Sequence, residues 1–113
     1  MHELAITQSL LSIVLEQANA VQAKKITKIN LVIGEMANVV DQCVQFYFDF
    51  ISKDSIAAEA ALSFQQVPIQ VRCRECAAIF SPSQLDWTCP HCHGEGVEVV
   101  AGQEFYIESI EVE

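Results

Sequence analysis

The amino-acid sequence predicts an α+β (mixed α/β) fold, with two helices on a three-stranded sheet and a four-cysteine module inserted before the last strand. The apolar residues change along the chain between a helical spacing and a strand spacing, which is the main sign of both element types. Four of the five cysteines lie within residues 73–92. With 113 residues, 51% hydrophobic and 19% charged, the chain can form one ordinary domain with a small insert.

The first two elements are a helix and a strand. Leu4, Leu11 and Ala18 recur at helical spacing within residues 3–22, which contain neither glycine nor proline. Residues 26–33 then alternate with a period of two, which predicts a strand, and Gly34 ends it.

A second helix and two further strands follow. Residues 39–52 are apolar almost all round, so this helix is predicted deep in the core or against a partner. Asn38 is the expected N-cap, with Asp41 in the first turn. Residues 60–66 and 104–113 alternate as strands do. Sequence order alone leaves the order of strands in the sheet open.

The cysteines form two C-x-x-C pairs that predict a structural zinc site. Cys73 and Cys76 make one pair, and Cys89 and Cys92 make the other, with twelve residues between the pairs. Each pair can turn two thiolates onto one ion, and two pairs complete the closed tetrahedral shell of structural zinc. The segment is too small to fold on a core of its own, so a zinc-ribbon-like module is expected. Iron in the same shell and a redox disulfide pair are the alternatives.

The expected division is therefore one α/β domain, residues 1–68 plus 99–113, and an inserted zinc-binding domain, residues 69–98. His93 directly follows the second cysteine pair. It is either a loop residue without function or a donor that hydrogen-bonds or replaces a zinc ligand.

The composition argues against several classes of function. A formal net charge of −9 repels phosphate backbones, so nucleic-acid binding is not expected. A secretory signal and a membrane-length apolar run are both lacking in the sequence, which favours a cytoplasmic protein with reduced thiols and no membrane contact. Three histidines, with no phosphate loop and no Ser-His-Asp set, give no support to an enzyme.

His2 indicates a second metal site. Its bulk should prevent removal of Met1, so the Met1 amine, the His2 backbone nitrogen and the His2 imidazole can close two fused chelate rings. Such a nitrogen-rich planar set favours Ni(II) or Cu(II), with Glu3 or a distant group as the fourth donor. A histidine at this position taken alone is more often without function.

The pattern of the whole chain resembles the HypA/HybF family of nickel-insertion accessory proteins for NiFe-hydrogenase maturation. The matching segments are Met1-His2-Glu3-Leu4, Ile33-Gly34-Glu35, Val44-Gln45-Phe46-Tyr47-Phe48, Cys89-Pro90-His91-Cys92-His93-Gly94 and Ile107-Glu108-Ser109-Ile110-Glu111-Val112.

The resemblance implies a nickel metallochaperone. His2 would be the principal nickel ligand, with Met1 and Glu3 contributing, and the four paired cysteines would hold Zn2+. The family passes Ni2+ to the hydrogenase large-subunit precursor and works with a HypB-type nickel GTPase, while a homodimer stays open. The rival interpretation is a zinc-ribbon adaptor that binds only proteins, in which His2 binds no metal.

Overall fold

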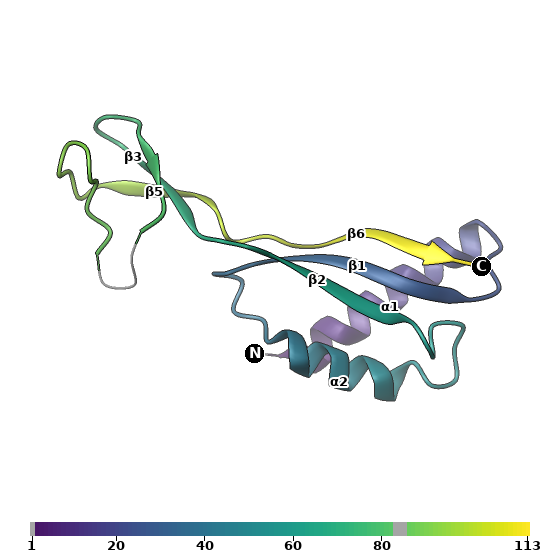
Figure 1. Ribbon diagram of the computed structural model, residues 1–113. Helices are drawn as coiled ribbons and strands as arrows, with labels where there is room; N and C mark the ends of the chain where they lie inside the picture. The colour runs from purple at the N-terminus through teal and green to yellow at the C-terminus, as the bar shows by residue number, and fades with distance from the viewer. Residues whose placement is uncertain (1, 83–85) are drawn as a thin grey trace. The chain divides into compact units, whose positions relative to one another are not determined.

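The computed structural model describes residues 2–82 and 86–113, and its helices and strands confirm the predicted α+β class (Figure 1). The elements are α1 (Glu3–Ala20), β1 (Ile26–Gly34), α2 (Asp41–Ile51), β2 (Ala61–Val67), β3 (Gln70–Cys73), β4 (Ile79–Phe80), β5 (Val97–Ala101) and β6 (Phe105–Val112). The first helix ends two residues before the predicted end, because the backbone turns at Val21 and Gln22 takes a positive φ of 56°.

The strands form two three-stranded sheets. The first has the order β2-β1-β6, and the second has the order β4-β3-β5. In the first sheet, β6 returns antiparallel to β1, since Lys25 and Glu113 exchange both backbone hydrogen bonds, over 2.8 Å and 3.3 Å, as directly opposed residues of antiparallel strands do. In the second, β3 pairs antiparallel with both neighbours. The last strand of the chain is therefore an edge of the first sheet, which the sequence had left open.

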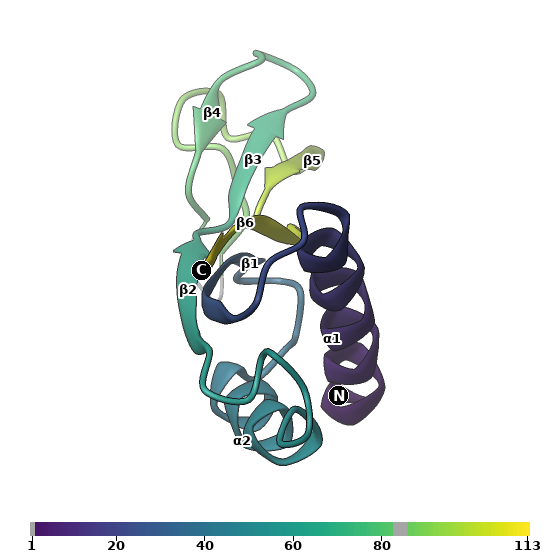
Figure 2. The ribbon, with the colours of Figure 1, turned by 90° about the vertical axis from the view of Figure 1, so that its right-hand side faces the viewer.

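Both helices cover the same face of the first sheet (Figure 2). The core between them contains Leu10 and Val14 from α1, Ile29 and Leu31 from β1, and Phe48 from α2. The two strand residues are two positions apart and the two α1 residues are four apart. These are the spacings that put side chains on one face of a strand and of a helix.

Helix α2 differs from the prediction in its start and in its burial. It begins at Asp41 with Val40 as the N-cap residue, and Asn38 lies two residues earlier with a φ of 59°. The expected Asn38 cap was therefore wrong, although Asp41 does lie in the first turn. The helix is also not buried all round, because Phe46 and Phe50 are exposed. The opposite face of α2 already fills the space against the first sheet and α1.

The chain forms two compact units. The first comprises the chain up to Val32, together with Asn38–Gln65 and Tyr106–Glu113, and the second comprises Ile33–Ala37 and Gln66–Phe105. The second unit contains all four paired cysteines. Among the described residues, neither helix combines the length and the hydropathy that a membrane crossing requires.

Candidate metal centre

The four paired cysteines meet at one point of the second unit. Their sulfur atoms all lie within 4.8 Å of one another. The Sγ atoms of Cys73 and Cys92 are 3.4 Å apart, and those of Cys76 and Cys89 are 3.5 Å apart. Tetrahedral zinc with Zn–S bonds of about 2.3 Å would separate its sulfur ligands by about 3.8 Å. The cluster therefore has the size and the donor set that a zinc ion needs.

Each cysteine pair is a turn closed by the same two backbone hydrogen bonds. In the first turn, the Ala77 N–H donates to the Cys73 carbonyl and the Cys73 N–H to the Ala78 carbonyl, each over 2.9 Å. In the second, the His93 N–H donates to the Cys89 carbonyl and the Cys89 N–H to the Gly94 carbonyl, again over 2.9 Å. The equal spacing of the two pairs thus produces two equivalent turns, and each presents two sulfurs to the same point.

The residue after each pair has a left-handed backbone. Ala77 has a φ of 64° and His93 a φ of 62°. A non-glycine residue pays about 1–2 kcal/mol for this conformation, so the hydrogen bonds of the turns must offset that cost. His93 is exposed at this position. Its backbone completes the second turn, and the suggested role of its imidazole beside zinc stays a prediction.

The four thiols have divergent proton affinities. Backbone N–H groups of Cys76 and Glu75 lower the pKa of the Cys73 thiol. Burial raises the pKa of the Cys89 thiol, but the N–H groups of Cys92 and His91 outweigh burial and bring that pKa to about 6.

Cys92 shows the opposite behaviour. The Gly94 N–H lowers the pKa of its thiol, but the adjacent Cys73 sulfur and burial raise it to about 12. Sulfurs so close together cannot all carry a negative charge unless a cation lies between them. A divalent ion supplies that charge and deprotonates all four thiols on binding.

Glu75 is a neighbour of the cluster that no sequence pattern indicated. Its carboxylate oxygen Oε2 lies 3.9 Å from the Cys92 sulfur. The same oxygen occupies the space that a Cβ atom on Gly94 would need. Gly94 thus allows the carboxylate to approach the cysteine cluster.

The predicted nickel ligands lie at the beginning of α1. His2 is exposed, has a φ of 58° and precedes the first helical residue. Glu3 begins the helix, and its carboxylate accepts a hydrogen bond of 3.2 Å from the Val40 N–H at the start of α2. Met1, the third predicted contributor, lies outside the described residues.

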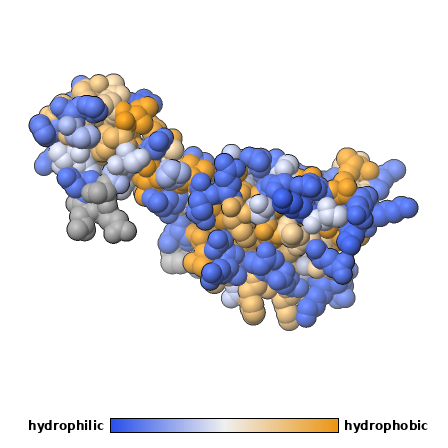
Figure 3. All heavy atoms as spheres, viewed as in Figure 1, coloured by the Kyte–Doolittle hydropathy of each residue, from blue (hydrophilic) through white to orange (hydrophobic). Residues whose placement is uncertain are grey.

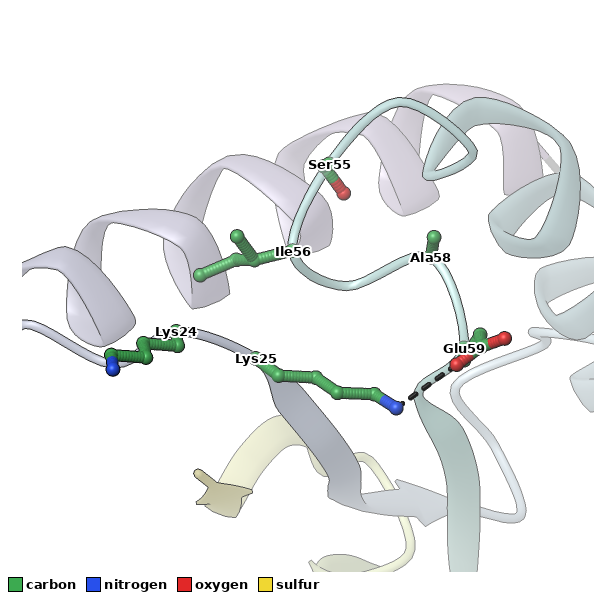
Figure 4. A pocket seen from close by; sticks show the side chains of 6 residues that line it. All are labelled: Lys24, Lys25, Ser55, Ile56, Ala58 and Glu59. Carbon is green, nitrogen blue, oxygen red and sulfur yellow. Dashed lines mark hydrogen bonds and ion pairs between the residues drawn. The ribbon is translucent and has the colours of Figure 1, made fainter.

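A separate hollow lies at the other end of α1 (Figure 4). The Lys25 ammonium pairs there with the Glu59 carboxylate over 2.9 Å. The hollow is lined by Lys24, Lys25, Ser55, Ile56, Ala58 and Glu59. The lining residues are neither a set of metal ligands nor a nucleophile with a base. This hollow therefore adds no metal or catalytic site.

Comparison with known proteins identifies the family. A family model described as hydrogenase/urease nickel incorporation, metallochaperone, HypA matches residues 1–112. The chain belongs to the HypA family. The hydrogenase maturation factor HypA of Dehalococcoides mccartyi (strain ATCC BAA-2266) is 48% identical over 113 residues, covering 100% of this chain and 95% of that protein. HypA of Caldanaerobacter subterraneus is 43% identical over 114 residues, covering both proteins completely.

Solved structures of HypA proteins share the fold. A solution structure of a HypA protein superposes with a TM-score of 0.76 at 28% identity, covering 99% of this chain and 96% of the other. The nickel metallochaperone HypA of Helicobacter pylori superposes with a TM-score of 0.67 at 28% identity, covering 99% and 97%. As a HypA-family member, the chain is a nickel metallochaperone of hydrogenase maturation and not an enzyme.

Proposed function

We propose that the chain binds Ni(II) at its N-terminus through His2 and delivers it to the hydrogenase large-subunit precursor. The observation that carries this proposal is the full-length match to the HypA family, in a chain that begins Met1-His2-Glu3. The donors would be the Met1 amine, the His2 backbone nitrogen and the His2 imidazole. Nitrogen donors of this kind suit the planar geometry that Ni(II) prefers.

The start of α1 supports such a site in two ways. His2 is exposed, so its imidazole is accessible to an ion arriving from solvent or from a partner. The Glu3 carboxylate, held at the Val40 N–H, lies one residue from the imidazole donor. Glu3 is therefore proposed as a supporting ligand that would turn from this hydrogen bond toward the metal.

Cargo and structural metal would use separate sites. Four thiolates in a closed shell hold zinc permanently, whereas a few donors at one end of the chain can release nickel one bond at a time. We propose zinc at the four cysteines, in an inserted domain of residues 69–98, and a nickel-binding domain of residues 1–68 plus 99–113. A cytoplasmic location, which keeps the thiols reduced, and a HypB-type nickel GTPase as a partner belong to the same proposal.

Nickel titration calorimetry on the zinc-loaded protein tests the proposal. The protein must keep its native Met1 without an N-terminal tag, because a tag removes the free amine. We expect about one tight nickel ion per chain, lost in a His2→Ala variant that retains its zinc. His93→Ala is the matched control, since this histidine is also exposed and should leave nickel affinity unchanged. Nickel affinity unchanged by His2→Ala would reject the N-terminal site and leave the protein-binding zinc adaptor.

A further inference from the structure

Helix α2 exposes two aromatic side chains that its own fold leaves uncovered. Phe46 and Phe50 are 68% and 65% exposed, whereas Val44 and Phe48 on the same helix are completely buried. Phe46 and Phe50 are four residues apart, so they lie one above the other on the helix surface. The two exposed rings therefore form a continuous apolar stripe.

The stripe is one wall of a groove between α1 and α2, here called the helix groove. It has a volume of about 380 Å³, and its lining residues are Leu4, Gln8, Phe46, Tyr47, Phe50 and Ile51. Figure 3 shows apolar side chains projecting from the lower side of the first unit, where Figure 1 draws α2.

The aromatic wall is held in position before anything binds. The Phe46 and Tyr47 rings meet edge to face, with centroids 5.5 Å apart. The Lys53 ammonium lies 5.2 Å from the centre of the Phe50 ring. Side chains that are already ordered lose little conformational entropy when a partner covers them, which favours binding.

The charges on the two helices indicate what kind of partner fits. Glu3, Glu16, Asp41 and Asp49 lie on α1 and α2, and neither helix contains a lysine or an arginine. The Lys53 ammonium beside Phe50, just beyond the end of α2, is an opposing charge that these carboxylates outnumber. A second copy of the chain would bring another acidic pair of helices, and a net charge of −9, against the first. A partner with basic residues beside its apolar ones gains attraction instead of repulsion.

We propose that the helix groove docks an amphipathic helical segment of a partner protein, apolar on one side and bordered by lysine or arginine. Apolar side chains of the segment would fill the space between Leu4 and the two phenylalanines, and its basic side chains would face the carboxylates of α1 and α2. Leu4 is two residues from His2. If the proposed nickel site is correct, a partner seated in the groove lies beside the nickel ligands.

Fluorescence anisotropy with a labelled model peptide tests the proposal. The probe is a helical peptide of about 18 residues made of leucine and lysine, and its counterpart carries glutamate in place of lysine. We expect the lysine peptide to bind and the glutamate peptide to bind at least about tenfold more weakly. The double variant Phe46→Ala/Phe50→Ala should weaken binding of the lysine peptide at least about tenfold, because buried aromatic residues dominate such contacts.

Ile13→Ala is the matched control. Ile13 is 45% exposed on α1, and nine residues of helix put it about half a turn round from Leu4. This variant should bind the lysine peptide as the unchanged protein does. Equal loss in both variants, equal binding of both peptides, or no binding of the lysine peptide would overturn the proposal.

Other occupants of the groove would give distinct results. Sedimentation showing a dimer that Phe46→Ala/Phe50→Ala converts to a monomer would assign the groove to a second copy. Binding to phosphatidylcholine vesicles, lost in the same variant, would assign it to lipid. The nickel site is tested separately, because His2→Ala should leave peptide binding intact and the groove variant should leave nickel binding intact.

Discussion

Replacing Gly34 with alanine should destabilise the second unit, because two backbone segments meet there without room for a side chain. Gly34 ends β1, and Gly102 directly follows β5. A Cβ atom on Gly34 would overlap the carbonyl group of Gly102 and lie 2.6 Å from the Gln103 nitrogen. Backbone atoms, unlike the end of a flexible side chain, cannot rotate away, so the two segments would have to separate.

The magnitude follows from what that separation disturbs. The Gly34 N–H donates to the Glu104 carbonyl and the Met36 N–H to the Gly102 carbonyl, each over 2.6 Å. Overpacking costs about 1–3 kcal/mol. Each weakened hydrogen bond adds up to about 1 kcal/mol. The reduced freedom of the unfolded chain returns only about 0.4–1 kcal/mol. The free energy of unfolding should therefore fall by about 1–4 kcal/mol.

Urea denaturation of the zinc-loaded protein, followed by circular dichroism, measures this change. Gly96→Ala is the matched control, because the nearest atom to its added Cβ would be the Arg74 Cδ at 3.9 Å, an ordinary contact. We expect Gly96→Ala to change the free energy of unfolding by less than about 1 kcal/mol. If Gly34→Ala were as stable as Gly96→Ala, the close approach of the two segments would be refuted.

Three further predictions concern the cysteine turns and the core. Cys76→Ser should lower the zinc content from about one ion per chain, measured by mass spectrometry of the metal, because the closed shell loses a ligand. Ala77→Gly should raise the free energy of unfolding of the zinc-loaded protein, measured by thermal denaturation, by about 1 kcal/mol, since Ala77 has a φ of 64°. Ala78→Gly, one residue further along the chain, should lower that free energy of unfolding by about 0.5–1 kcal/mol. Measured by urea denaturation, Phe48→Ala should lower the free energy of unfolding by about 3–5 kcal/mol. Phe46→Ala should cost less than about 0.5 kcal/mol, because this ring is 68% exposed.

Specific results would contradict each of these. Full zinc content in Cys76→Ser would mean that three cysteines suffice. A loss of stability in Ala77→Gly equal to that in Ala78→Gly would reject the left-handed turn. Similar costs for Phe48→Ala and Phe46→Ala would reject the two-faced arrangement of α2, and with it the helix groove.

The sequence by itself determined the features that depend on neighbouring residues. Periods of two and of three to four residues place the strands and helices, because side chains on one face must share one environment. Each C-x-x-C pair closes a turn from five or six consecutive residues, so the cysteine cluster could be expected from spacing alone. The opening Met1-His2-Glu3 indicates a chelating N-terminus only together with the pattern of the whole chain, and the nickel site there stays a prediction.

Only the tertiary structure decided what depends on residues far apart in the chain. In α2 nearly every position is apolar, so the sequence could not tell Phe48, completely buried, from Phe46 and Phe50, more than half exposed. The Val40 N–H finds its acceptor on Glu3, 37 residues earlier, which is why the local Asn38 cap was wrong. A sequence pattern reports a residue's neighbours along the chain, whereas burial and capping here depend on which segments the fold brings together.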